Sequence, residues 1–484
     1  MNDETPVYSS TFNYLTPIGY TTSAVCGYCK TTHSSYSYYA QTSSMSPEFY
    51  QEIADRSWRR SGSLLYRPDP HRSCCPHYTV RLDSTSYKPT RNQRQALNKF
   101  NKHIIGDEYI KAAARLYPLS REEARRRDTH FDLISRVHEA EYCNLKSPPK
   151  PAHKFTVTLE DDSYTDEKFA LYQHYQRTVH KEEEESITKR GFSRFLCNSP
   201  LRRGKFETKD GTERDIGSFH QCYRIDGRLV AVGILDLLPH CVSSVYFMYD
   251  ESLFKFSPGK LSAMMEISLA IERGYKWWYA GFYIHSSSKM KYKMDFSPQY
   301  ILDPSVYEYI EVDKAILSLL DRPYCDLKAA HKQWQDNLHA GVDNSTFVFQ
   351  NDTGENDNDE DCEDDEDVYM TSDDDEDNTD GDDHPSSGND SEKSKKRPHR
   401  PQNIFLLNTR MPGIPTIDGM RNVNLDKIPL RIRSSGHTIH TGDISYWRTK
   451  SFDEFPGLKA SIAELVAALG GQEIIKQVCL EFMR

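Results

Sequence analysis

The spacing of apolar and polar residues along this chain predicts both helices and strands. Apolar residues alternate over 155–159, as they do in a half-buried strand. Phe169, Tyr172 and Tyr175 recur at helical spacing and form the apolar side of a helix predicted over 164–189. A strand and a helix therefore follow each other directly in this part of the chain.

The strongest strand signals come next. We expect strands over 223–225, 229–238 and 241–249, a helix over 261–273 and a strand over 275–283. Asp226-Gly227 is typical of a two-residue hairpin turn, and Gly274 ends the helix. The order β-β-β-α-β predicts a mixed sheet with a crossover helix, so the expected fold class is α/β or α+β.

Basic helices are predicted over residues 91–145. Ser120 is a suitable N-cap, with Glu122 and Glu123 in the first turn of the helix that it begins. The positive charges fit either a solvated helix face or a contact with an RNA backbone. Ser147–Pro151 then predicts a stiff linker.

Composition changes sharply in the last third of the chain. Residues 351–392 contain 21 Asp or Glu and no Lys or Arg, so we expect a disordered insertion. They also account for the net charge of −11, because the remainder has 61 basic against 51 acidic residues, a balance that permits a phosphate-bearing partner. Lys393–Pro398 fits a nuclear-import signal or a solvated linker end.

The chain after residue 402 is apolar again. Leu458, Ile462, Leu465 and Leu469 fall at helical spacing, and Gly470 stops that helix. We expect this tail to pack on the folded body.

Cysteine usage bears on the compartment and on metal binding. Eleven cysteines, many of them isolated, do not resemble a secreted disulfide framework, and no run of about 18 apolar residues predicts a membrane span. The start MNDETPVYSS has no basic or apolar leader pattern. We therefore expect a reducing compartment, the cytoplasm and also the nucleus, and no membrane partner.

Four thiols form two tight pairs, Cys26 with Cys29 and Cys74 with Cys75. Two such pairs can bind one Zn²⁺ ion or an iron–sulfur cluster. Adjacent cysteines reach one metal only from a turn, which Pro76 permits; on a strand, His77 would share a face with the second cysteine and compete as a ligand. A disulfide or buried free thiols are the alternatives.

Seven short blocks resemble the arginyl-tRNA–protein transferase family. They are Cys26–Cys29, Ser57–Gly62, Cys74–Tyr78, Gly217–Gln221, Tyr223–Gly227, Leu235–His240 and Tyr279–His285. The match covers roughly 20–90 and 155–310. The family commonly has glutamine where this chain has His77, which argues for Cys74 and Cys75 as the ligands.

The resemblance implies transfer of arginine from arginyl-tRNA to proteins that begin with Asp, Glu or oxidised Cys, which marks them for ubiquitin-dependent degradation. It also implies a GNAT-like fold over 155–310 and zinc or an iron–sulfur cluster on the cysteines. The expected organisation is a Cys-rich metal-binding domain over 1–95, a basic helical connector over 96–150, a GNAT-like transfer domain over 151–350, the acidic insertion with its basic end over 351–401 and a packed tail over 402–484.

The reaction would be attack of an α-amine on an activated ester, so it needs a proton acceptor but no ATP. Asp236, late in a strand, and His240, just past it, are candidates, and Asp236 can instead pair with a guanidinium. His285 is a third catalytic candidate, on the same face as Tyr283, which we expect to bind substrate. Glu266 is either part of a guanidinium pocket or an exposed helix residue.

Two further groups suit the substrates. We expect lysines and an aromatic ring to contact the tRNA end, namely Lys260, Lys289, Lys291, Tyr292 and Lys293. The alternative is that the lysines form a solvated run. Arg59 and Arg60 can read the carboxylate of an acidic acceptor residue. His220 is more typical of a satisfied buried histidine.

Two other functions remain as alternatives, an acyl-CoA-dependent acetyltransferase and a zinc-containing RNA-binding adaptor. Ser257–Lys260 lacks the leading Arg or Gln and the second glycine of an acyl-CoA loop, which argues against coenzyme A. The adaptor leaves Asp236 and the β-β-β-α-β order unexplained.

Overall fold

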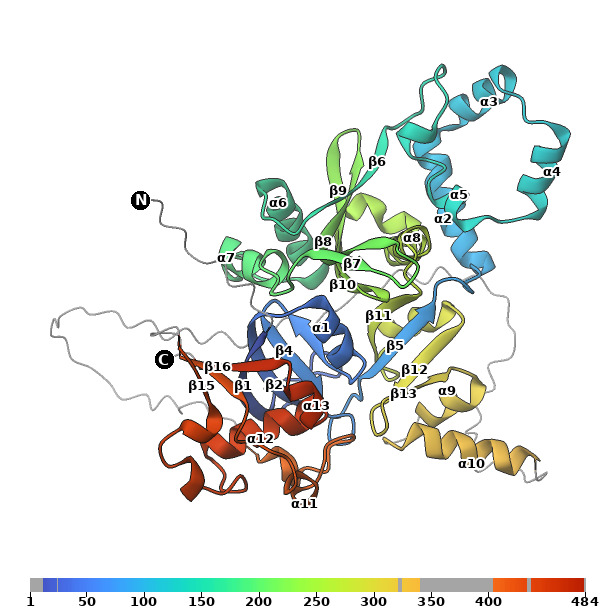
Figure 1. Ribbon diagram of the computed structural model, residues 1–484. Helices are drawn as coiled ribbons and strands as arrows, with labels where there is room; N and C mark the ends of the chain where they lie inside the picture. Colours follow the sequence, from blue (N-terminus) through green and yellow to red (C-terminus); the bar gives the residue numbers. More distant parts are fainter. Residues whose placement is uncertain (1–11, 24, 321–323, 340–403, 433–436, 483–484) are drawn as a thin grey trace, which may run out of the picture.

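The computed structural model describes residues 12–23, 25–320, 324–339, 404–432 and 437–482, which form two sheets with helices around them (Figure 1). The acidic segment 351–392 and Lys393–Pro398 lie outside these ranges, so the predictions made for them stay predictions. Within the described ranges, no helix is both long and apolar enough to cross a membrane.

The first sheet has the strand order β15-β14-β16-β1-β2-β4-β3 and combines both ends of the described chain. Its strands are β1 (Asn13–Thr22), β2 (Tyr36–Ser44), β3 (Arg59–Ser61), β4 (Leu64–Pro68), β14 (Pro429–Ile432), β15 (Thr438–His440) and β16 (Val478–Phe482). β16 lies between β14 and β1 and runs parallel to both. The tail, which we expected to pack on the folded body, thus pairs with strand β1 of the N-terminal region.

The second sheet has the order β13-β12-β5-β11-β10-β9-β8-β6, with β7 paired to β8. Its strands are β5 (Tyr78–Asp83), β6 (Phe155–Asp161), β7 (Gly204–Glu207), β8 (Glu213–Ile225), β9 (Arg228–Leu238), β10 (Cys241–Tyr249), β11 (Trp277–Tyr283), β12 (Gln299–Asp303) and β13 (Glu308–Glu311). β5 precedes residue 95, yet it pairs with β11 and β12 of this sheet. The chain therefore crosses between the sheets just before β5.

The predicted β-β-β-α-β order and the mixed α/β class are confirmed. Asp226 and Gly227 have φ values of 52° and 84°, so both residues of the hairpin turn adopt the left-handed region that such turns require. The crossover helix α8 (Pro258–Glu272) packs on β10 and β11. Its neighbour β10 contacts α6 (Asp166–Tyr175) as well, so this strand lies in the interior.

The basic region contains four helices: α2 (Arg91–Ile105), α3 (Asp107–Leu116), α4 (Arg121–Thr129) and α5 (Leu133–Val137). Ser120 caps α4, accepting a hydrogen bond from the Glu123 amide while the Glu123 carboxylate accepts one from the Ser120 amide. α3 and α4 project away from the two sheets (Figure 1). No described side chain of α4 is buried, which fits the prediction of a solvated helix.

One predicted helix is too long. In place of a single helix over 164–189, α6 continues into a π-helical turn, Gln176–His180, and ends where Lys181 adopts a φ of 59°. The following Glu-rich residues are polar and exposed, so no apolar stripe supports a longer helix. Phe169, Tyr172 and Tyr175 are buried as predicted.

The remaining α-helices lie around the two sheets. They are α1 (Pro47–Ala54), α7 (Lys189–Phe192), α9 (Lys314–Leu320), α10 (Leu327–His339), α11 (Ile417–Met420), α12 (Leu458–Leu469) and α13 (Gln472–Ile475). α12 is the predicted C-terminal helix, and Gly470 follows it with a φ of 100°. Its apolar residues form the core under the first sheet.

Candidate active site and metal site

The four predicted ligand cysteines come together where the chain crosses between the sheets. The sulfur atoms of Cys26, Cys29, Cys74 and Cys75 all lie within 4.8 Å of one another. Cys26 and Cys75 are buried, whereas Cys29 and Cys74 are exposed. Four thiols gathered around one point from two loops fit the donor set of a zinc ion or an iron–sulfur cluster. The donor set does not distinguish the two.

Neighbouring hydroxyls act on the thiols. The contact between Cys29 Sγ and Thr31 Oγ1 is 3.3 Å, and this hydrogen bond lowers the pKa of Cys29 to about 6. Burial raises the pKa of Cys74 to about 12, although the Ser34 hydroxyl donates to its sulfur. Since thiolates are the ligands of metals, the hydrogen bond from Thr31 favours the metal-binding form of Cys29.

His77 does not join the cysteines. Its ring packs edge-on against Tyr28 and Phe282, with centroids 5.3 and 5.4 Å away. It is 4% exposed, and burial lowers its pKa to about 4, so the ring is neutral near pH 7. The structure gives it a packing position on β11 rather than a place in the group of four thiols.

The loop after β11 touches the cluster. Ser286 Oγ donates to Cys75 Sγ at 3.4 Å. Tyr283 and His285, three residues and one residue before Ser286, share a face as predicted, because the Tyr283 hydroxyl lies 2.9 Å from His285 Nδ1. The cysteines and these two candidate site residues therefore lie at one end of β11.

Arg60 and Asp236 form a buried ion pair between the sheets. Arg60 Nε donates to Asp236 Oδ2 at 2.7 Å, and Arg60 Nη2 donates to Oδ1 at 2.5 Å. The Ser218 hydroxyl lies 2.5 Å from the same Oδ1. Both ionic side chains are at most 3% exposed. The guanidinium that Asp236 binds is thus one of this chain's own.

Arg59 lies next to this pair but has different partners. Its Nη1 donates to the carbonyl oxygens of Ala54 at 3.0 Å and Trp58 at 2.7 Å. The guanidinium carbon lies over the rings of Tyr279 and Phe282, 5.8 and 5.2 Å from their centroids. Arg59 is 6% exposed and takes part in no ion pair with any residue that the structure describes.

Glu266 lies in the interior, where β10 and β11 separate. The two strands pair only from Cys241 with Trp277 to Ser243 with Tyr279, and β10 then has a bulge between Ser244 and Tyr246. Beyond that point a small cavity of about 20 Å³ is lined by Glu266, Ser244, Trp278, Tyr292 and Lys293, among others.

The Glu266 carboxylate accepts hydrogen bonds from Trp278 Nε1 at 2.7 Å, Ser262 Oγ at 2.7 Å and Ser244 Oγ at 3.5 Å. Burial raises its pKa against these bonds. It is 1% exposed, so the expected alternative of an exposed helix residue is wrong. The apolar neighbours of Glu266 in the sequence did not indicate that this side chain is buried, because α8 is buried on nearly every side and its apolar residues mark no single buried face.

The predicted cations for tRNA do not form one surface. Lys291 is exposed, and Lys260 is half-buried in the first turn of α8. Lys293 is buried, with its Nζ donating to the carbonyl oxygens of Ala280 and Phe282 at 3.0 and 3.2 Å. Tyr292 is half-buried, and the side chain of Lys289 lies outside the described structure.

The two other predicted histidines are separate from these groups. His240 is exposed in the turn after β9, with its ring packed edge-on against Phe206. His220 is buried, its Nε2 lies 3.0 Å from the Leu196 carbonyl oxygen, and burial lowers its pKa to about 4. His220 is buried as expected, but it is only half satisfied, because its buried Nδ1 has no hydrogen-bond partner among the described residues.

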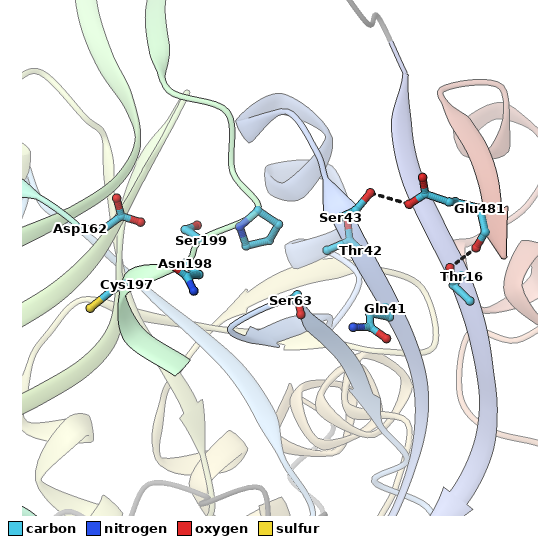
Figure 2. Close-up of a pocket in the computed structure, with 11 residues that line it drawn as sticks. Thr16, Gln41, Thr42, Ser43, Ser63, Asp162, Cys197, Asn198, Ser199 and Glu481 are labelled. Atoms are coloured by element: carbon cyan, nitrogen blue, oxygen red, sulfur yellow. Dashed lines mark hydrogen bonds between the residues drawn. The ribbon is translucent and has the colours of Figure 1, made fainter. Parts of the chain in front are cut away.

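A polar cavity of about 510 Å³ is lined by residues of β1 and β2 and by the segment 197–200 (Figure 2). Its walls carry Gln41 and Ser43 on β2, Asp162, Ser199 and Glu481. Ser43 donates to the Glu481 carboxylate at 2.7 Å (Figure 2). None of the predicted site residues lines this cavity.

A hydrogen-bonded chain links this cavity to the ion pair. Ser199 Oγ lies 2.6 Å from Ser218 Oγ, which contacts Asp236. The sequence did not indicate Ser218 as a partner of Asp236, because a bulge between Tyr223 and Arg224 shifts the hairpin register that pairs these two residues.

Two family models match the parts of the chain that supply these groups. The model for the N terminus of arginine-tRNA-protein transferase matches residues 24–95, and the model for its C terminus matches residues 167–303. Both parts of the chain are therefore similar to arginine-tRNA-protein transferases. The matches include the four cysteines, both arginines, Asp236 and Glu266. Residues 96–166 lie between them.

Individual relatives agree. Arginyl-tRNA–protein transferase 1 of Saccharomyces cerevisiae is 29% identical over 288 residues, which are 56% of this chain and 52% of the relative. The transferase 1 of Drosophila melanogaster is 27% identical over 399 residues, 61% of this chain and 82% of the relative. An aspartate/glutamate leucyltransferase of Pseudomonas fluorescens is 24% identical over 254 residues, 52% of this chain and 80% of the relative. The chain spans about half the length of the yeast relative.

Proposed function

We propose that this protein transfers arginine from arginyl-tRNA to the α-amine of proteins that begin with Asp, Glu or oxidised Cys, marking them for ubiquitin-dependent degradation. The amine nitrogen attacks the arginyl ester carbonyl, a peptide bond forms, and the terminal ribose hydroxyl of the tRNA leaves with a proton. The ester is already activated, so ATP is not consumed. Similarity to the arginyltransferases supports this reaction.

The observation that carries the proposal is the buried Glu266 carboxylate. It forms no ion pair with any described residue, although burial disfavours an isolated charge. An arginyl guanidinium would neutralise it and stack on the aromatic rings around it. The cavity of about 20 Å³ holds roughly one water, so Tyr292 would have to move aside when arginine enters.

The separation of β10 and β11 beside this cavity supports a GNAT-like fold for the transfer region. The bulge after Ser244 leaves backbone N–H groups out of the strand ladder, where they could stabilise the oxyanion of the attacked ester. Lys260 and Lys291, with Lys289, would meet the phosphates of the tRNA end. His285 and His240 are the candidates for accepting the amine proton, because Asp236 is already bonded to Arg60.

The cysteines would hold zinc or an iron–sulfur cluster through four thiolates. Bound there, the metal would tie the loop of Cys26 and Cys29 to the chain segment that enters β5, and would fix Ser286 through Cys75. Its role in this proposal is to shape the site.

The test is a transfer assay with the full chain. Labelled arginyl-tRNA or labelled acetyl-CoA is incubated with a peptide that begins with Asp, and the peptide is analysed for label. We expect arginine on the peptide's N-terminus and no acetyl group. Binding of arginyl-tRNA with no transfer to any acidic peptide would overturn the proposal and would favour an RNA-binding adaptor.

A further inference from the structure

Two adjacent arginines present the same pair of donors, and only one pair is occupied. Arg60 uses Nε and Nη2 to hold both oxygens of Asp236. The same two nitrogens of Arg59 are buried and have no hydrogen-bond partner among the residues that the structure describes. A guanidinium edge of this shape matches a carboxylate, as the Arg60–Asp236 pair itself illustrates.

Arg59 is held in position but is not neutralised. Its Nη1 is fixed by the carbonyl oxygens of Ala54 and Trp58. Asp55, a nearby acid on the same loop, uses its carboxylate to accept from Tyr279 at 2.6 Å, Tyr309 at 2.8 Å and Gln51 at 3.2 Å. A buried cation with two unsatisfied N–H donors is costly unless an anion completes it.

The position of Arg59 relative to Glu266 follows from a bulge in β11. Gly281 has a φ of 78°, and the pairing with β5 shifts between Tyr279 and Phe282. As a result, Tyr279 and Phe282 both face Arg59, whereas Trp278 and Ala280 line the cavity of Glu266. The two charged groups therefore lie on opposite sides of β11, next to the opening between β10 and β11.

We infer that Arg59 binds the side-chain carboxylate of the acceptor protein's N-terminal Asp or Glu, and that Arg60 is a positioning residue locked by Asp236. This inference rests on the proposed function, and it assigns different roles to two arginines that the sequence alone does not distinguish. An Asn or Gln side chain would turn an N–H₂ group toward the donors of Arg59, which leaves buried donors unpaired. Arg59 thereby determines the specificity for acids.

The experiment compares kcat/KM for peptides that differ only in a first residue of Asp or Asn, using the wild type, Arg59→Gln and Arg59→Lys. We expect Arg59→Gln to lower kcat/KM for the Asp peptide by about 100-fold, mainly through KM, and to bring the Asp/Asn ratio close to 1. Arg59→Lys keeps the charge without the paired donors, so the ratio should fall by about 10-fold. Affinity for arginyl-tRNA should not change.

Arg67→Gln is the matched control. Arg67 is a buried arginine on β4, and it donates to the carbonyl oxygens of Ala468 at 2.6 Å and Pro412 at 2.8 Å. Its substitution tests the general cost of losing a buried arginine and should leave the Asp/Asn ratio unchanged. Thermal unfolding of each variant accompanies the kinetics.

Three results overturn the inference. One is a folded Arg59→Gln protein that keeps the wild-type Asp/Asn ratio, and another is an equal loss for both peptides. If Arg59→Gln does not fold, an unchanged ratio in Arg59→Lys is the third. Failure of the proposed function is distinguishable, because the wild type would then transfer arginine to neither peptide. In that case, calorimetric binding of the Asp peptide to wild type and to Arg59→Lys decides whether Arg59 binds the acidic side chain.

Discussion

Ser286 Oγ donates to Cys75 Sγ across 211 residues of sequence. This contact joins the cysteine cluster to the loop that follows β11, one residue after His285, which is hydrogen-bonded to Tyr283. The proposed metal binding and arginine transfer would therefore be physically linked, because a ligand that fixes Cys75 would also restrict the loop beside the candidate catalytic residues.

Replacing Cys26 with Ser should abolish metal binding, since Cys26 is a fully buried member of the set of four thiols. We expect zinc and iron contents to fall to background and the rate of arginine transfer to fall by about 10-fold or more. Elemental analysis after anaerobic purification measures the first effect. Cys143→Ser, at an exposed cysteine outside the cluster, is the control, and equal metal in both variants would show that the cluster is not the site.

Replacing Asp236 with Asn should destabilise the protein by about 3–5 kcal/mol, because Arg60 would remain as a buried cation without its carboxylate. Urea denaturation followed by tryptophan fluorescence gives the change in unfolding free energy. Asp166→Asn removes one partner of the exposed Lys189–Asp166 pair and should change the unfolding free energy far less, because solvent screens this pair. Similar losses in the two variants would contradict the assigned role of the buried pair.

Replacing Glu266 with Gln should keep the fold, since an amide can retain part of the hydrogen bonding to Trp278 and Ser262. The arginyl guanidinium would lose its counter-charge, so kcat/KM for arginyl-tRNA should fall by about 100-fold. Glu272→Gln, at the exposed end of the same helix, should have wild-type kinetics. Full activity of Glu266→Gln would remove Glu266 from the arginine site.

Glu464 on α12 should make stability depend on pH. Burial raises its pKa from 4.5 to about 7 in the folded protein, even though it accepts a hydrogen bond from the Leu406 amide. The folded state thus keeps a proton that the unfolded state has lost, so stability falls as pH rises from 4.5 to 7 and then levels off. The loss should be about 3 kcal/mol.

The Glu464→Gln variant isolates this effect. Its side chain cannot ionise, so the wild type should lose about 3 kcal/mol relative to it between pH 4.5 and pH 7.5. Urea denaturation at several pH values in this window measures the difference. A constant difference across the window would mean that Glu464 ionises normally in the folded state.

Local patterns predicted the elements well and the cysteine group correctly. The Asp226-Gly227 turn sets the first pairs of β8 and β9, and the capping box at Ser120 lies within four residues. Each of the two cysteine pairs is recognisable from the short spacing between its own two residues. Such features need no knowledge of distant parts of the chain.

The partners of the charged residues were not predictable in this way. The Arg60–Asp236 pair joins residues from different sheets, and the burial of Glu266 depends on β10, β11 and the turn Ser288–Asp295 covering one side of α8. Lys293 lies among residue types that are usually exposed, yet its Nζ donates hydrogen bonds to carbonyl oxygens of β11. Tertiary packing determines the burial and the partners of these residues, and the local sequence pattern does not reveal them.

The parallel pairing of β1 with β16 matches Asn13 with Val478, and the Asn13 side chain bonds to a carbonyl 464 residues away. During synthesis on the ribosome, β1 therefore has one open edge until almost all of the described chain has emerged. Its exposed backbone groups could pair with other nascent strands in that interval. Residues 478–482 close that edge of β1, so this protection against edge-to-edge pairing comes late in the synthesis of the described chain.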